Sequence, residues 1–162
     1  MTDSVRVVVF DGGLRVVEQP APLPGPGEAL IGLRLAGICQ TDLELMHGYK
    51  GFRGPLGHEF VGEVLAGPDE WRGRRVVGEI NITCGECDQC RAGVPSHCRA
   101  RRILGLFDYD GAFADAFRLP VHNLWPVPDS VPDEVAVFVE PVAAACEITA
   151  QVAVRPTDRM VV

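Results

Sequence analysis

Most of the chain is a succession of short apolar runs, rich in Val, Ile, Leu and Phe, that are separated by Gly, Pro and Asp. Such runs predict β-strands, because β-branched and aromatic side chains pack well on a pleated sheet while Gly, Pro and Asp favour turns. The proline-rich segment 20–27 can be neither a helix nor an inner strand. The expected strands cover residues 5–10, 14–18, 28–36, 60–66, 75–82, 113–119 and 121–127. Many short strands at this spacing predict a small β-barrel or sandwich, so the expected fold class is mainly β with a few helices.

A short helix is predicted inside this strand-rich region, over residues 41–47. Thr41 or Asp42 is expected at its N-cap, because both side chains carry an oxygen that accepts a hydrogen bond from a free backbone N–H group. Gly48 is expected to end the helix, since glycine adopts the left-handed conformation of a helix C-terminus without strain.

The pattern changes toward the C-terminus, where helices are expected. Pro132 suits the first turn of a helix that continues through residues 135–139. A second helical stretch, rich in alanine, is expected over residues 142–154, directly after a proline. We interpret Cys146 in this stretch as a core residue. Residues 159–162 are typical of the beginning of another strand.

Composition and charge narrow the class of protein. The 162 residues include 15 Lys and Arg against 22 Asp and Glu, for a formal net charge of −7, and 47% are hydrophobic. This length fits one domain with room for the beginning of another, and the hydrophobic fraction is sufficient for a core. The charge argues against a nucleic-acid or anionic-membrane surface. The sequence contains neither a run of about 18 apolar residues nor a secretory signal, so a cytoplasmic protein is expected.

Four of the six cysteines lie within one short segment, at Cys84, Cys87, Cys90 and Cys98. In a reducing compartment such clustering favours metal binding over disulfides, and four converging thiolates suit tetrahedral zinc. The first three share the spacing of iron–sulfur ferredoxins, but the final gap of seven residues does not. Four unligated thiols are disfavoured because exposed free cysteines are a liability. A site closed by four protein ligands has no position for substrate, so a structural zinc is predicted in the segment 83–100.

A second set of ligand-type residues lies at junctions between expected elements, and it comprises Cys39, His58, Glu59 and Glu140. A thiolate, an imidazole and carboxylates on separate element ends could form an open zinc site with one exchangeable position. Each residue also has an ordinary structural interpretation: a small core cysteine, a histidine bonded to a carbonyl, a solvated or capping carboxylate. Spacing alone leaves both alternatives open.

The motifs that contain these residues resemble those of one protein family. They are Gly37-Ile38-Cys39-x-Thr41-Asp42, Gly57-His58-Glu59-Phe60-Val61-Gly62-x-Val64, the four-cysteine segment and Glu140-Pro141. In this order they resemble the zinc-dependent medium-chain dehydrogenase/reductase family, which includes alcohol, polyol, glucose and threonine dehydrogenases. The resemblance runs over residues 5–162. Zinc-free quinone reductases share the fold but lack these ligands, so they are a poor match.

The resemblance implies a GroES-like β-barrel that binds two zinc ions. Residues 1–155 would form this zinc-binding catalytic domain, and residues 156–162 would begin a Rossmann cofactor domain. The four-cysteine segment matches the structural-zinc lobe of the family. The family binds NAD or NADP at a G-x-G-x-x-G turn, which this sequence lacks, so the chain alone is expected to be inactive. The alternative is a stand-alone zinc-binding barrel with a binding or assembly role.

The resemblance also implies roles for the residues of the second set. Cys39 and His58 match ligands of the catalytic zinc. Glu59 looks like the neighbouring carboxylate that binds zinc directly or exchanges with water. Glu140 occupies the position where alcohol dehydrogenases often have a cysteine ligand. Polyol- and glucose-type members frequently carry Glu or Gln there, which in some of them binds the zinc through water.

The implied reaction is hydride transfer between a small-molecule alcohol and NAD or NADP, with a preference for secondary alcohols, polyols or sugars. Thr41 matches the hydroxyl that relays the proton. Glu44 stands where many alcohol dehydrogenases have a relay histidine, and it could accept the proton, or nearby His47 could substitute. A solvent-facing carboxylate is the alternative interpretation of Glu44. Family members are commonly dimers or tetramers, which favours a homo-oligomer.

Overall fold

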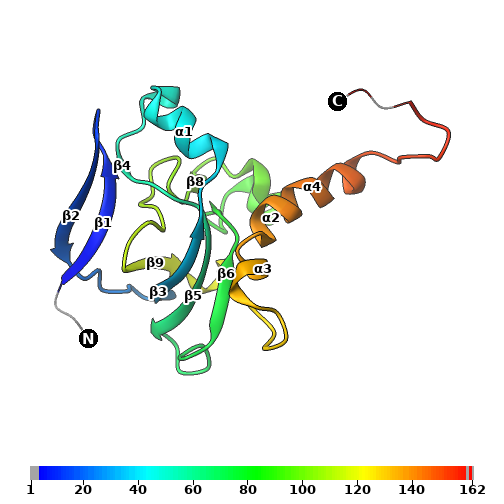
Figure 1. Ribbon diagram of the computed structural model, residues 1–162. Coiled ribbons are helices and arrows are strands. Elements are labelled where there is room, and N and C mark those ends of the chain that lie inside the picture. The colour runs from blue at the N-terminus through cyan, green and yellow to red at the C-terminus, as the bar shows by residue number, and fades with distance from the viewer. Residues whose placement is uncertain (1–3, 160, 162) are drawn as a thin grey trace.

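The computed structural model of the protein describes residues 4–159 and Val161. Its regular structure is mainly β (Figure 1), which confirms the expected fold class. The strands are β1 (Ser4–Phe10), β2 (Leu14–Pro20), β3 (Glu28–Gly37), β4 (Gly54–Pro55), β5 (Glu59–Ala66), β6 (Arg75–Gly78), β7 (Asn81–Ile82), β8 (Arg102–Ile103), β9 (Ala116–Pro120) and β10 (Leu124–Pro126). The helices are α1 (Gln40–Met46), α2 (Asp88–Arg91), α3 (Asp133–Ala136) and α4 (Val139–Gln151), with single 3-10 turns at Tyr49–Gly51, Pro95–His97 and Val121–Asn123.

A curled antiparallel sheet in the order β10-β6-β5-β3-β9 forms the half-barrel. A second sheet, β2-β1-β4, lies beside it, and β7 pairs with β8 at the base of the four-cysteine segment. The central strand β3 pairs with β5 on one side and with β9 on the other. Two register shifts interrupt its pairing with β5, and such irregularities increase the local bend of a sheet. This pairing brings the end of β3 to the beginning of β5.

The main core lies inside the curl of the sheet. Ala29 and Ile31, on alternate positions of β3, are fully buried. The rings of Phe60 and Phe117 pack edge to face beside them, with centroids 4.8 Å apart and planes at 82°. Burying an isoleucine or phenylalanine side chain in this way stabilises a fold by about 1.5–3 kcal/mol. The core therefore holds β3, β5 and β9 in one register.

The helix expected over residues 41–47 is α1, but its N-cap differs from the prediction. The cap is Cys39 rather than Thr41 or Asp42. Asp42 is the third residue of the helix, and its Oδ2 accepts a hydrogen bond from the Cys39 N–H at 2.9 Å. This reciprocal contact is a capping box, and it places the cysteine at the junction of β3 and α1.

The strand expected over residues 75–82 is broken into β6 and β7. The buried side chain of Asn123 donates hydrogen bonds to the carbonyls of Glu79 at 2.7 Å and Asn81 at 3.0 Å. These side-chain bonds satisfy carbonyls that a neighbouring strand would otherwise pair with, so the chain turns between β6 and β7. The two strands expected further along are also shorter than the apolar runs that predicted them.

The C-terminal part differs most from expectation. Helix α4 extends away from the sheet in Figure 1 and begins two residues before Pro141. Pro141 thus lies in the first turn of the helix, where a backbone N–H has no partner within the helix, so the proline breaks no hydrogen bond. Cys146 is exposed, so its interpretation as a core residue was wrong. Of the strand expected over residues 159–162, Arg159 and Val161 are not in a strand, and the other two residues lie outside the described part. No helix of the described residues has the length and apolarity needed to cross a membrane.

Candidate metal centres

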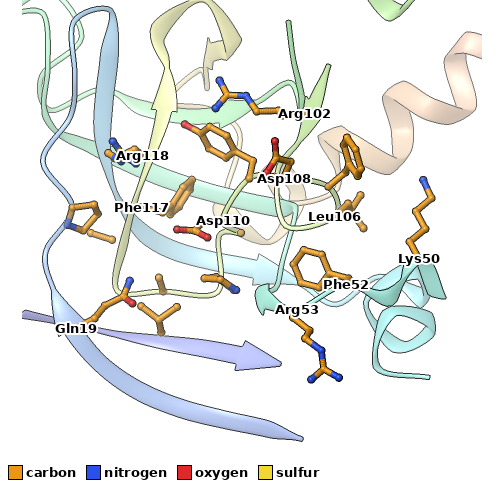
Figure 2. A pocket seen from close by; sticks show the side chains of 18 residues that line it. Gln19, Lys50, Phe52, Arg53, Arg102, Leu106, Asp108, Asp110, Phe117 and Arg118 are labelled. Carbon is orange, nitrogen blue, oxygen red and sulfur yellow. The ribbon is translucent and has the colours of Figure 1, made fainter. Parts of the chain in front are cut away.

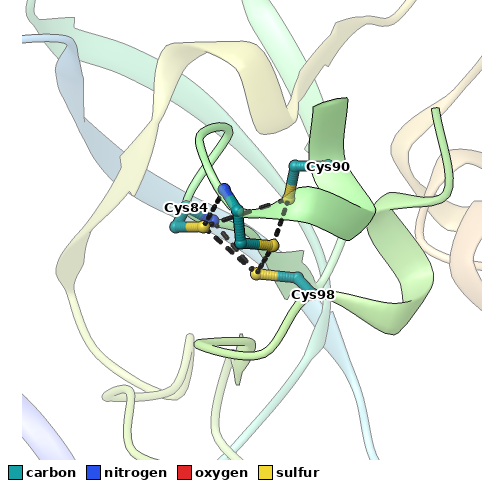
Figure 3. Close-up of side chains that lie close together, drawn as sticks. Cys84, Cys90 and Cys98 are labelled. Atoms are coloured by element: carbon teal, nitrogen blue, oxygen red, sulfur yellow. Dashed lines mark hydrogen bonds between the residues drawn. The ribbon is translucent and has the colours of Figure 1, made fainter. Parts of the chain in front are cut away.

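The four cysteines of the segment 83–100 bring their sulfur atoms together (Figure 3). The Sγ atoms lie 3.5 Å apart in the pairs Cys87–Cys90 and Cys84–Cys98, and 4.0 Å apart in the pairs Cys84–Cys90 and Cys87–Cys98. Four sulfurs bound tetrahedrally at about 2.3 Å from a zinc ion would be about 3.8 Å apart. The separations thus fit one zinc ion. An iron–sulfur cluster fits less well, because its thiolates bind different irons and lie further apart.

Backbone N–H groups favour the thiolate forms in this four-cysteine segment. The Cys84 N–H donates to Cys98 Sγ at 3.3 Å, and the Cys87 N–H donates to Cys84 Sγ at 3.4 Å. Hydrogen bonds from the backbone of Arg99 and Cys90 lower the pKa of the Cys87 thiol to about 6, while burial and the neighbouring thiols raise that of Cys90 to about 12. Because zinc binds thiolates, these donors prepare the segment for metal.

The second cluster forms where β3 ends and β5 begins. Ligand-type atoms of Cys39, His58 and Glu59 all lie within 4.8 Å of one another. Cys39 lies two residues after the end of β3, and antiparallel pairing places Gly37 of β3 opposite Glu59 of β5. Gly57, with φ of 98°, makes the left-handed turn that leads into His58. The structure therefore brings together three of the four residues of the predicted open site.

A buried carboxylate lies behind the histidine of this cluster. His58 Nδ1 is 3.4 Å from Asp42 Oδ1, and the two side chains are 3% and 2% exposed. Neither atom has a hydrogen-bond partner of good geometry, so the contact is a close approach of two buried polar groups. Burial lowers the pKa of His58, but Asp42 and Cys39 outweigh it and raise the pKa to about 9. A carboxylate at one ring nitrogen orients an imidazole and leaves the other nitrogen for a metal ion.

The role of Asp42 is the part of the site that sequence reasoning missed. That reasoning treats Asp42 only as a possible cap of the helix at residues 41–47. The available signal was its place in the same motif as Cys39, one helical turn further on. A residue three positions after an N-cap points back over that cap, so its carboxylate can serve both the cap and a group beside it. The two oxygens of Asp42 divide these tasks, one toward the Cys39 N–H and one toward His58.

Of the two predicted proton-transfer residues, one lies beside the cluster and the other does not. Thr41 Oγ1 is 3.5 Å from Cys39 Sγ. Glu44 is exposed on α1, where its Oε1 accepts a hydrogen bond from Gln40 Nε2 at 2.9 Å. His47, the alternative acceptor, is also exposed. The proton-transfer roles of these side chains remain predictions.

Glu140 approaches the cluster without joining it. It lies half-buried in the first turn of α4, outside the set of ligand-type atoms within 4.8 Å. Burial raises the pKa of Glu140, the charge of His58 lowers it, and the charges of Glu59 and Glu79 raise it. Glu140 is therefore near enough to interact electrostatically with the cluster, and its predicted role as a ligand remains a prediction.

Figure 2 shows a groove of about 650 Å³. It runs between the β1–β2 hairpin and the segment 102–118, and its lining combines charged and apolar side chains. Lys50 and Asp108 line it and both adopt positive φ, 54° and 51°. None of the residues of the two candidate metal centres lines this groove.

Comparisons with known proteins agree with these features. The alcohol dehydrogenase GroES-like domain matches residues 25–129. The L-threonine 3-dehydrogenase of Chelativorans sp. (strain BNC1) is 40% identical over 158 residues, which cover 90% of this chain and 46% of the relative. The chain thus spans about half the length of the curated relatives it matches.

Solved structures share the same fold. A short chain alcohol dehydrogenase of E. coli CFT073, complexed with NADH, superposes with a TM-score of 0.87 at 29% identity, over 93% of this chain and 46% of that one. A cobalt- and zinc-bound thermostable alcohol dehydrogenase from Pyrobaculum aerophilum gives 0.82 at 28% identity, over 94% and 50%. Residues 25–129, which match the family, include Cys39, His58 and all four cysteines of the four-cysteine segment. The chain belongs to the alcohol dehydrogenase GroES-like domain family, as its motifs had indicated.

Proposed function

We propose that this chain is the catalytic domain of a zinc-dependent oxidoreductase, which interconverts an alcohol and a carbonyl compound by hydride transfer with NAD or NADP. The observation that carries the proposal is the cluster of Cys39, His58 and Glu59, whose ligand-type atoms lie within 4.8 Å of one another. The buried Asp42 behind the histidine supports it, because an imidazole oriented in this way is typical of metal ligands. The donor set of one sulfur, one nitrogen and one carboxylate suits zinc with an open position.

In this proposal a zinc ion at the cluster supplies Lewis acidity, which lowers the pKa of an alcohol hydroxyl and polarises a carbonyl. The chain's own residues hold the site and move the proton. Asp42 orients the His58 ring through Nδ1. The Thr41 hydroxyl, 3.5 Å from Cys39 Sγ, accepts the substrate proton and passes it outward. Glu44, three residues further along α1 and exposed, lies at the solvent end of that route.

The substrate proposed is a small secondary alcohol. The relatives named L-threonine 3-dehydrogenase act on a 3-hydroxy group, which is a secondary alcohol, and polyols and sugars carry the same group. The nicotinamide cofactor is assigned to a part of the protein other than this chain, since the chain has no glycine-rich turn of the dinucleotide-binding type.

Zinc counting tests the two metal sites. We expect two zinc ions per chain by elemental analysis and one in Cys39→Ala. The matched control is Cys146→Ala, which removes an exposed cysteine on α4 and should retain both ions. A Cys39→Ala protein with an unchanged zinc count would show that the second cluster does not bind zinc.

Activity is tested on the protein as its native host makes it. Formation of reduced nicotinamide is followed with L-threonine, other secondary alcohols and polyols, each with NAD and with NADP. We expect oxidation of at least one of them and its loss in Cys39→Ala. A host-made protein that retains both zinc ions and oxidises none of these alcohols would instead favour a stand-alone zinc-binding module.

A further inference from the structure

Gly37 and Glu59 face each other across the pair β3–β5, one as the last residue of its strand and the other as the first. Side chains of directly opposed residues share one face of an antiparallel sheet. A Cβ placed at position 37 would lie 3.1 Å from the Cβ and 3.3 Å from the Cδ of Glu59, and it would overlap the carboxylate oxygen Oε2. The Glu59 carboxylate therefore occupies the space that a side chain at position 37 would need.

The glycine at position 37 is required by this space and not by backbone conformation. Gly37 does not have the positive φ that makes glycine necessary at Gly57, so other residues could adopt its backbone angles. Its nearest neighbours are atoms of Glu59 only, and the overlapping atom is the far end of a flexible side chain. An alanine here would displace the carboxylate before it disturbed the strands.

We propose that Gly37 is a positioning residue for Glu59, and that the missing side chain lets the carboxylate lie over β3 and reach the Cys39–His58 cluster. The inference rests on the proposed metal site. Glu59 is 6% exposed, so its carboxylate is held among protein groups and not in solvent. An alanine methyl group must stand about 3.5 Å from any atom it contacts, which moves the carboxylate oxygen by roughly 1 Å. Metal ligands tolerate only about 0.5 Å of misplacement.

Cobalt binding tests this inference without reference to activity. The protein is first loaded with zinc at the four-cysteine segment and then titrated with Co2+. The same titration is made with Cys39→Ala. The part of the visible absorption that is lost in this variant reports Co2+ binding at the second cluster. We expect Gly37→Ala to weaken Co2+ binding about 10- to 100-fold and to shift the absorption bands. The matched control is Gly32→Ala, on the same strand, where the three atoms nearest to an added Cβ belong to the Leu65 side chain, the closest at 3.0 Å. It should leave affinity and spectrum unchanged.

A double-mutant cycle separates an effect through Glu59 from an effect on the nearby backbone of Cys39. In a Glu59→Ala background, Gly37→Ala should cause no further loss of Co2+ affinity. A loss of equal size in both backgrounds would overturn the inference. If Gly37→Ala alone does not fold, Glu59→Ala together with Gly37→Ala should restore folding, and failure to do so would also overturn it.

The outcomes distinguish this inference from the proposed function. A wild-type protein without any Cys39-dependent Co2+ absorption would refute the metal site itself, and the positioning role with it. If the wild-type protein shows that absorption and Gly37→Ala has the same Co2+ affinity and spectrum, the positioning role alone would be refuted.

Discussion

The four-cysteine segment 83–100 should lose its structure when it loses its metal, while the barrel stays folded. Cys98 is the one buried residue of this segment. Helix α2 has four residues, and so short a helix is not stable by itself. The ion pair of Asp88 and Arg99, 2.7 Å long, is exposed on both sides, and exposed ion pairs add little to stability. Metal binding is therefore the dominant stabilising contribution in the segment.

The magnitude follows from the number of ligands. Structural zinc contributes about 10–16 kcal/mol to small four-ligand domains, so one of four similar thiolates accounts for about 3 kcal/mol. Cys87→Ser should thus weaken zinc binding at least about a hundredfold. The disturbance should stop at the base of the segment, where β7 pairs with β8 and the adjoining Ile82 and Leu104 are buried in the barrel core.

Hydrogen exchange measured by mass spectrometry gives the assay. In Cys87→Ser, or after zinc is removed with a chelator under reducing conditions, backbone amides of residues 83–100 should exchange rapidly while those of β3 remain protected. The control Cys146→Ser should exchange as the wild type does, because that thiol is exposed and outside both clusters. Unchanged protection of residues 83–100 after zinc loss, verified by elemental analysis, would refute the reasoning. Simultaneous loss of protection in β3 would refute the independence of the barrel.

Two further predictions concern stability. Asp133 binds Arg34 and Arg75, both at 2.8 Å, and the hydrogen bond from Arg34 leads the effects that hold the pKa of this carboxyl below its usual value. A carboxyl group whose pKa is lower in the folded than in the unfolded protein stabilises the fold at pH values above the unfolded-state pKa of about 4. Asp133→Asn should therefore lower the free energy of unfolding, measured by urea denaturation at pH 7, by about 1 kcal/mol. The difference from wild type should shrink as the pH falls below about 4. A difference independent of pH would contradict the ionic origin. Gly57→Ala should lower the free energy of unfolding by about 2 kcal/mol or more, because φ at Gly57 is 98° and a Cβ would overlap the ring of Phe113. A variant as stable as wild type would show that the turn into His58 tolerates a side chain.

The sequence alone was sufficient for the features that depend on neighbouring residues. Cys84, Cys87, Cys90 and Cys98 of the four-cysteine segment lie within one short stretch of sequence, so local chain turns can bring them together independently of the rest of the fold. The strands β1, β2, β3 and β5 were predicted to within a residue or two, since short apolar and β-branched runs bounded by turn residues are typical of strands. The family motifs likewise lie in continuous stretches of sequence.

Only the tertiary structure decided what depends on register between distant segments. The antiparallel pairing of β3 with β5 sets Gly37 opposite Glu59, and a shift by one residue would turn the carboxylate to the other face. The same packing buries Asp42 against His58 and leaves Glu140 outside the set of ligand-type atoms that lie within 4.8 Å of one another. It also leaves Cys146 exposed, although its helix is rich in apolar residues. Local patterns specify which elements form, whereas the packing of distant elements determines which side chains meet.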